Sequence, residues 1–209
     1  MSHEGRDYFS FDPAERQKEA KCFLSIYQDM PLVQQVHEVF GGIGLMMEVL
    51  KELGHSPKWH STWDHSTRCI EELRRKWPKG AHIQVDSFGT PLPTMLMHPS
   101  LISADFNTFS PLRAVRDKKY GRLLDGIFQA QPDWVEITDS AVYRLHLNRP
   151  YYSQLFAQEI TDVKAYLTAT SRWFFLRYGY SIVRAAHHRG ASYYLLTRTK
   201  PRKFAVEAI

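Results

Sequence analysis

The sequence predicts an α/β fold in which a mostly parallel sheet is covered by helices on both faces. Short runs rich in β-branched and aromatic residues alternate with segments whose apolar residues recur at helical spacing. A glycine-rich turn, Phe40-Gly41-Gly42-Ile43-Gly44, lies directly between one such run and one such segment. Two β-rich runs near the C-terminus are joined by a tight turn, which indicates an antiparallel hairpin. Alternating strands and helices form parallel sheets, so the hairpin should add one reversed strand at the edge.

The N-terminal half of the chain alternates helix and strand. Asp12 followed by Pro13 is a good helix start, because Asp can cap a helix and Pro is tolerated in its first turn. Ser66 is a plausible cap for another helix. We therefore expect an arm and helix within residues 1–30, with the helix at 13–27, then a strand at 32–40, a helix at 45–53, a strand at 58–64 and a helix at 67–77.

The C-terminal half continues the alternation after a turn at Pro78-Lys79-Gly80 and a Pro-rich connection. The expected elements are strands at 82–86, 100–106 and 134–140, a basic helix at 111–129, a turn or helix at 141–148, one long or two shorter helices within 151–176, and hairpin strands at 179–187 and 192–200. These strands make a seven-stranded sheet. At 209 residues the chain fits one domain, residues 1–209.

Composition indicates a globular protein with an anionic partner. Hydrophobic residues make up 44% of the chain, which is enough for a substantial core. No apolar run approaches the roughly 18 residues that cross a bilayer, so no membrane partner is expected. Cys22 and Cys69 lack metal or disulfide spacing, which indicates free thiols and a cytoplasmic location. The net charge of +5 and the isoelectric point near 9.2 favour nucleic acid as a partner through basic surface groups.

The glycine-rich turn is the main candidate for ligand binding. Glycines between a strand and a helix allow close approach to the main chain, which a side chain would obstruct. The helix that begins near Leu45 would direct its free N–H groups to this point, which suits a carboxylate or a phosphate. The alternative is a tight turn with a purely structural role.

This turn resembles the first motif of class I S-adenosylmethionine (SAM) methyltransferases, in which an acidic residue and a hydrophobic one precede alternating glycines. Glu38 is the acidic residue here, and Phe40 replaces the first glycine, as in the Phe-x-Gly-x-Gly form of 5-methylcytosine DNA methyltransferases. The resemblance extends as a topology from about Val33 to Lys200. It implies a Rossmann-like, mostly parallel seven-stranded sheet with a C-terminal antiparallel hairpin, and S-adenosyl-L-methionine as cofactor. Glu38, Phe40, Gly41, Gly42 and Gly44 are then cofactor-binding candidates.

The same resemblance places cofactor contacts at the ends of the second and third strands. In the family an acidic residue at the end of the second strand accepts hydrogen bonds from the ribose hydroxyls, and Asp64 matches it. Asp86 matches the residue that contacts the adenine amino group, with Ser87 or Phe88 beside the ring. Trp63 is a further candidate for stacking on adenine. A helix cap remains the alternative for Asp64, and a core position the alternative for Trp63.

The position of the family's fourth motif, where the transferred methyl group meets its acceptor, falls on Asp105-Phe106-Asn107. Asp105 and Asn107 are catalytic candidates, because a polar group there can orient or deprotonate an acceptor; an Asx turn is the alternative. His146 follows the fifth strand and is a candidate general base, or a surface histidine. The cysteine nucleophile of 5-methylcytosine enzymes has no match, because Cys22 follows Lys21 and Cys69 follows Arg68.

These residues favour a SAM-dependent methyltransferase that acts on nucleic acid, DNA or RNA. Substrate choice would rest on the N-terminal helix, the segment 140–152, a protein partner or a second copy of the chain. One alternative is a catalytically silent protein of the same fold that serves as a binding or scaffold module. A nicotinamide-dependent oxidoreductase is another. No metal is expected, because the spacing of His55, His60 and His65 would not make them converge.

Overall fold

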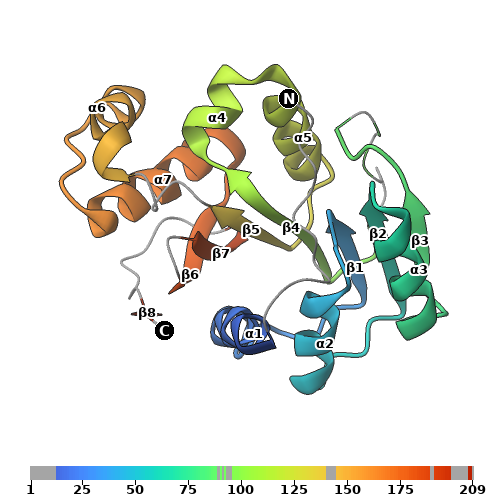
Figure 1. Ribbon diagram of the computed structural model, residues 1–209. Helices are drawn as coiled ribbons and strands as arrows, with labels where there is room; N and C mark the ends of the chain where they lie inside the picture. The colour runs from blue at the N-terminus through green and yellow to red at the C-terminus, as the bar shows by residue number, and fades with distance from the viewer. Residues whose placement is uncertain are drawn as a thin grey trace.

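A central sheet of eight strands organises the computed structural model (Figure 1). The structure describes residues 13–88, 90, 92, 96–139, 145–188, 191–198 and 207–208, and of residues 15, 105–109, 207 and 208 the backbone alone. The strand order is β3-β2-β1-β4-β5-β7-β6-β8. The strands are β1 (Gln35–Val39), β2 (Trp59–Asp64), β3 (Ala81–Gln84), β4 (Ser100–Phe109), β5 (Trp134–Asp139), β6 (Ser181–His188), β7 (Ala191–Thr197) and β8 (Glu207–Ala208).

The sheet is parallel from β3 to β5, and β7 is the reversed strand. β1 pairs with β2 on one side and with β4 on the other, so the strand order changes direction at β1. In open α/β sheets, ligands bind outside the carboxyl ends of the strands at such a switch point. The topology therefore puts the glycine-rich turn, which follows β1, at the expected ligand position.

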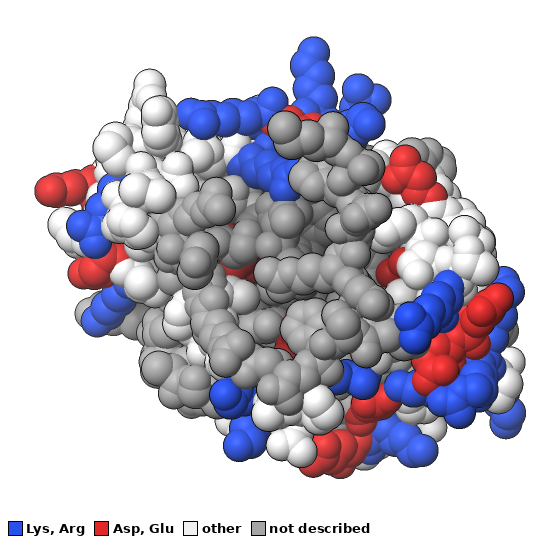
Figure 2. Space-filling view, in the orientation of Figure 1, with Lys and Arg blue, Asp and Glu red and all other residues white. Residues whose placement is uncertain are grey.

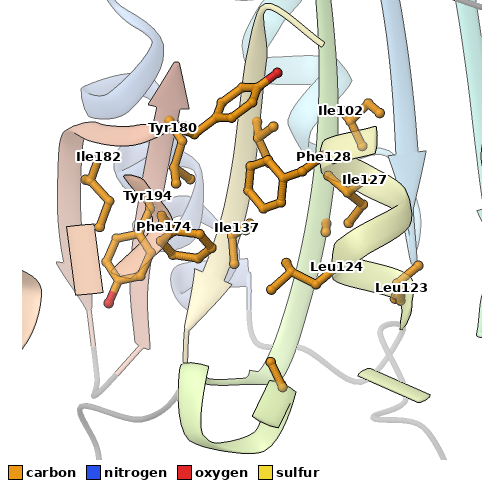
Figure 3. Close-up of a cluster of buried hydrophobic side chains, with 14 of the residues drawn as sticks. Ile102, Leu123, Leu124, Ile127, Phe128, Ile137, Phe174, Tyr180, Ile182 and Tyr194 are labelled. Atoms are coloured by element: carbon orange, nitrogen blue, oxygen red, sulfur yellow. The ribbon is translucent and has the colours of Figure 1, made fainter. Parts of the chain in front are cut away.

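Helices cover both faces of the sheet, as the sequence predicts (Figure 1). One core cluster joins α1 and α2 to Val36, Leu101 and Leu195 of the sheet. The second joins α5, α6 and α7 to the opposite face, where Ile102, Ile137 and Tyr194 meet Leu124 and Phe128 (Figure 3). The helices are α1 (Pro13–Tyr27), α2 (Leu45–Glu52), α3 (Thr67–Lys76), α4 (Pro111–Arg116), α5 (Lys118–Gln129), α6 (Leu145–Phe156) and α7 (Val163–Tyr178).

The predicted fold class is confirmed, with three differences in detail. β7 lies between β5 and β6 rather than at the edge, because the hairpin turns back towards β5. The two-residue strand β8 extends the predicted seven strands by pairing with β6. The predicted basic helix at 111–129 is divided into α4 and α5 at Asp117, whose side chain accepts the N–H of Lys119 and so caps the second helix.

The connection from β3 to β4 covers part of the sheet without a helix among its described residues. Its apolar side chains Val85, Phe88, Leu92 and Leu96 pack against the second core cluster. This cover is incomplete at the edge of the sheet, where Ile83 of β3 is 46% exposed.

Cys22 and Cys69 are buried free thiols, as predicted. Burial raises the pKa of Cys22 to about 12, so this thiol stays protonated and unreactive near neutral pH. None of the helices in the described part of the chain is long and apolar enough to cross a membrane.

Candidate functional site

The glycine-rich turn is shaped by backbone conformations that favour glycine. Gly42 and Gly44 have φ angles of 54° and 80°, in the left-handed region. Gly44 also caps α2, and a Cβ atom there would lie 2.9 Å from Leu73 Cδ2 and 3.0 Å from Trp77 Nε1. The turn therefore brings the amino end of α2 against α3. Its main chain carries no side chain at Gly42 or Gly44.

Asp64 connects this turn to the end of β2. One of its carboxylate oxygens accepts the N–H of Gly42 at 3.0 Å, and the other accepts the N–H of Ser66 at 2.8 Å. The residue is 2% exposed, and burial raises the pKa of its carboxyl group although both hydrogen bonds oppose this shift. The cap of α3 is Ser66, whose Oγ accepts the N–H of Cys69. The sequence thus correctly predicts Ser66 as the cap, and Asp64 instead fixes the glycine-rich turn.

Phe40 adopts a backbone conformation that favours glycine. Its φ angle is 61°, and its N–H donates to the carbonyl of Trp63 at 2.8 Å. A non-glycine residue in this region costs about 1–2 kcal/mol. The ring centroid of Phe40 lies 5.3 Å from that of Phe88, which in turn lies 4.7 Å from Tyr120. These three rings form an aromatic cluster between the turn and α5.

Glu38, a predicted cofactor-binding residue, lies beneath the turn with its carboxylate bonded to β2. Its Oε2 accepts from His60 Nε2 at 2.6 Å and from Thr62 Oγ1 at 2.8 Å, and the residue is 2% exposed. A Cβ atom on Gly41 would lie 2.3 Å from Thr62 Cγ2 and 3.0 Å from Glu38 Cβ. Glu38 therefore supports the turn from inside the sheet, because its carboxylate bonds to His60 and Thr62 of β2 and Gly41 packs directly over it.

Trp63 is a core residue, which corrects the hypothesis that it stacks on adenine. The side chain belongs to the cluster under α5 and is 7% exposed. Its ring packs edge-on against His37, with ring centroids 4.6 Å apart. The alternating side-chain directions of a strand explain this placement, because Trp63 points to the face opposite its neighbours Thr62 and Asp64.

Asp86 and Ser87 follow β3 beside Asp64, whose carbonyl accepts the N–H of Val85 at 3.0 Å. The exposed Asp86 accepts the N–H of Phe88 at 3.0 Å. Ser87 is 1% exposed, and its buried Oγ has no hydrogen-bond partner among the residues that the structure describes. A buried hydroxyl without a partner is unusual in a folded protein and indicates room for a partner from outside the chain.

The acceptor candidates lie at the carboxyl end of β4. Ala104 pairs with Ile137 and Phe109 with Asp139, so residues 105–108 of β4 face a single residue of β5 and form a bulge. Asp105 and Asn107 lie within this bulge, while their side chains lie outside the described part. His146 is exposed in the first turn of α6. Asp105 and Asn107 thus lie in the carboxyl-terminal part of β4 and His146 lies after β5, and the glycine-rich turn likewise follows the carboxyl end of β1.

The sequence does not predict a buried aspartate that lies at the end of β5. Asp139 is fully buried, and its Oδ2 accepts from Tyr166 at 2.7 Å and from Tyr194 at 2.9 Å. Burial, the charge of Asp139 and the hydrogen bond to it raise the pKa of both tyrosines well above the ordinary value. No local pattern marks this group, because its members come from β5, α7 and β7.

The residues around the turn suit a nucleotide-like cofactor that carries a carboxylate. The free N–H groups at the start of α2 favour an anion, and the bare main chain at Gly42 allows close approach. Asp64 accepts hydrogen bonds from the backbone of Gly42, Ser66 and His65, and a carboxylate has about four acceptor sites, so it can accept a further donor. Ser87 offers a hydroxyl that has no partner among the described residues. Within the described ranges, no group of three His, Cys, Asp or Glu residues could hold a metal ion.

The strand order and the glycine-rich turn after β1 define a Rossmann-like architecture. The reversed β7 between β5 and β6 specifies it further as the class I SAM-dependent methyltransferase fold, and solved structures confirm this fold. The complex of DhpI with SAM and HEP has a TM-score of 0.59 at 18% identity, over 90% of this chain and 89% of that chain.

Two further structures agree. The N-methyltransferase NodS from Bradyrhizobium japonicum WM9 gives a TM-score of 0.55 at 11% identity, over 90% of this chain and 99% of that chain. The ribosomal protein L11 methylase from Lactobacillus delbrueckii subsp. bulgaricus gives 0.55 at 13% identity, over 91% of this chain and 81% of that chain. No protein-family model matches the sequence, and no curated protein does so. The similarity is one of fold.

Proposed function

We propose that this protein is a SAM-dependent methyltransferase. The observation that carries the proposal is the hydrogen bond from the N–H of Gly42 to Asp64, which joins the glycine-rich turn to an acidic strand end at the switch point of the sheet. The buried hydroxyl of Ser87, which has no partner within the described part of the chain, supports the proposal. A structure with the same fold, that of DhpI, is named as a complex with SAM.

Each residue of the site has a distinct task in this proposal. The main chain at Gly42 and the amino end of α2 hold the carboxylate of the cofactor, Asp64 accepts from its ribose hydroxyls, and Ser87 binds its adenine end. When bound, SAM supplies an electrophilic methyl group. Asp105 and Asn107 orient the acceptor, and His146 is placed to take a proton from it. Alignment and exclusion of water are the main contributions of the protein to such a transfer.

Nucleic acid is the acceptor class that we propose. The similar structures are named for a ribosomal protein methylase and an N-methyltransferase, so they do not agree on one acceptor. The charge of this chain is therefore a better basis than these structures for proposing the acceptor class. Its net charge of +5 and isoelectric point of about 9.2 favour a polyanion.

A binding or scaffold protein without catalysis is the second candidate, and the strained Phe40 favours it. Phe40 occupies a glycine conformation, and its ring fills space beside Phe88. If the ring of Phe40 occupied the place of the cofactor, the protein would have the fold of a methyltransferase but would not bind SAM. Cofactor titration separates the two functions.

The cofactor site is tested by isothermal titration calorimetry with SAM, S-adenosylhomocysteine and NAD. We expect the first two to bind and NAD not to bind. Gly42→Ala should weaken SAM binding about tenfold or more, corresponding to about 1.4 kcal/mol, because the added methyl group covers the bare main chain. Gly54→Ala is the matched control: its φ is also left-handed, at 83°, and a Cβ atom there meets no atom within 4 Å.

Equal SAM affinity of the two alanine variants would contradict the site assignment. Absence of any SAM binding to the parent protein would favour the scaffold function. Transfer of a radiolabelled methyl group from SAM to RNA, DNA or protein then identifies the acceptor class, and transfer to protein alone would refute nucleic acid as the acceptor.

A further inference from the structure

A basic and aromatic surface lies beside the site, on α4, the first half of α5 and α6. We call it the α4–α6 surface. Figure 2 shows Lys and Arg side chains gathered at the upper rim, over α4 and α5 as placed in Figure 1. The residues that make up this surface are Arg113, Arg116, Lys118, Lys119, Arg122, Leu147, Arg149 and Tyr151.

The position of this surface links it to the proposed acceptor end of the site. α4 begins at Pro111, two residues after the last residue of β4, whose bulge carries Asp105 and Asn107. The guanidinium of Arg116 on α4 lies 4.7 Å from the ring centroid of Tyr151 on α6. A chain bound across α4 and α6 would therefore pass close to the bulge of β4.

Three cations of the surface lie outside the ion pairs of the described residues. Within the part of the chain that the structure describes, no ion pair involves Arg116, Lys119 or Arg122. On α3, by contrast, Arg75 pairs with Glu72 at 2.6 Å and Lys76 with Glu48 at 2.6 Å. These two cations of α3 are thus neutralised by glutamates, whereas Arg116, Lys119 and Arg122 of the α4–α6 surface keep their charge for a ligand.

Exposed aromatic and aliphatic side chains lie among these cations. Tyr151 is 48% exposed and Leu147 64% exposed, both on α6. The guanidinium of Arg113 stacks 3.7 Å from the ring centroid of Tyr120. Cations along a groove or face, with an aromatic ring on which a base can stack, are the features with which proteins bind single-stranded nucleic acid. A duplex would offer phosphates to the cations but no free base face to Tyr151.

We infer that the α4–α6 surface binds single-stranded nucleic acid, with Arg116, Lys119 and Arg122 on phosphates and a base stacked on Tyr151. This inference rests on the proposed function in one respect, that the bound strand is the methyl acceptor. Binding by the surface is itself independent of the cofactor. Oligonucleotide binding and SAM binding can therefore fail separately.

The test measures fluorescence anisotropy of labelled 12-nucleotide oligouridylate and oligothymidylate, and of a duplex of equal length, over a series of salt concentrations. We expect a single strand, RNA or DNA, to bind more tightly than the duplex. Arg116→Gln combined with Lys119→Gln should reduce the slope of log K against log salt by about 1.4, since each phosphate contact contributes about 0.7 on a single strand. Tyr151→Ala should weaken binding about tenfold and leave this slope unchanged.

The control is Arg75→Gln combined with Lys79→Gln, which removes the same charge at α3 and the turn after it. It should change neither the affinity nor the slope. Equal losses in both double variants, or equal binding of duplex and single strand, would overturn the inference. So would displacement of the oligonucleotide by vesicles rich in anionic lipid.

Calorimetry with SAM on the same proteins keeps the two proposals apart. A protein that binds SAM but no oligonucleotide refutes the α4–α6 surface and leaves the cofactor site intact. A protein that binds the oligonucleotide through Tyr151 but not SAM supports the surface and refutes the methyltransferase. Circular dichroism spectra that match the parent's show that each variant is folded.

Discussion

Single residues in left-handed conformations set the geometry of the turn between β1 and α2. Phe40, Gly42 and Gly44 all have positive φ, within five residues of one another. Only glycine adopts such angles without a steric cost. The two glycines thus meet a backbone requirement, whereas Phe40 bears a strain that its packing against Phe88 offsets.

The requirement at Gly44 is both conformational and steric, which gives a prediction at the residue scale. Gly54→Ala should lower the free energy of unfolding by about 1–2 kcal/mol, because its φ is left-handed and its surroundings are open. Gly44→Ala should lower it by a further 1–3 kcal/mol or so, because the new methyl group meets Leu73 and Trp77. Urea denaturation measures both values. Equal losses of unfolding free energy in the two variants would show that the close contact of Gly44 with Leu73 and Trp77 does not limit the side chain at this position.

Secondary-structure elements are joined by buried polar contacts as well as by apolar packing. Asp139 at the end of β5 holds α7 through Tyr166 and β7 through Tyr194. A hydrogen bond to a charged group contributes about 1.5–3 kcal/mol when buried. The carboxyl end of β5, next to the bulge of β4, is therefore anchored to the C-terminal elements.

Tyr166→Phe tests this anchor at the scale of elements. We expect a loss of about 1.5–3 kcal/mol in the free energy of unfolding, because the carboxylate of Asp139 loses a buried donor. Tyr178→Phe on the same helix is the control. Tyr178 donates to Asp125 at 2.6 Å, whose side chain is 38% exposed and can bind water instead, so less than about 1 kcal/mol should be lost. Chemical denaturation compares the two, and a larger loss for Tyr178→Phe would contradict the anchor.

At the scale of the whole molecule, a row of polar side chains crosses the sheet from β2 to β5. Thr62, Glu38, Ser103 and Glu136 are register partners on neighbouring strands β2, β1, β4 and β5. Ser103 donates to Glu136 at 2.6 Å and Thr138 donates to it at 3.1 Å. Burial nevertheless raises the pKa of Glu136 from 4.5 to about 7, and the carboxylates of Glu19 and Glu38 add to this shift.

The stability of the molecule should therefore depend on pH through Glu136. A raised pKa means that the folded protein binds this proton more tightly than the unfolded chain does. The contribution of Glu136 is thus full below about pH 4.5 and is lost as the pH rises to about 7. Over this range the parent should lose stability relative to Glu136→Gln by an amount on the order of 3 kcal/mol.

Urea denaturation of both proteins between pH 4.5 and 7.5 measures this difference. Other groups that titrate in the range, such as His37, whose pKa burial lowers to about 4, are present in both proteins and cancel. A difference in stability that does not change with pH would show that Glu136 does not titrate in this window.

Local patterns in the sequence determined most of the elements. Pro13, the cap at Ser66 and the apolar spacing after Gly44 are signals within a few residues, so the bounds of α1, α2 and α3 agree closely with the predictions. The alternation of strands and helices determined the parallel sheet, and the glycine-rich turn determined where the candidate site begins. The pairing of that turn with Asp64 agrees with the expectation that both belong to one site.

Tertiary structure alone decided which side chains face that site. A strand alternates its side chains between two faces, and only packing decides what each face meets, so Trp63 lies in the core and Glu38 bonds to β2 although their positions matched the motif. The place of β7 inside the sheet, the group around Asp139 and the link from Arg116 to Tyr151 join residues distant in the chain. The two partners of each such contact are far apart in the sequence. A local sequence pattern therefore cannot predict the contact, which forms only when the elements pack.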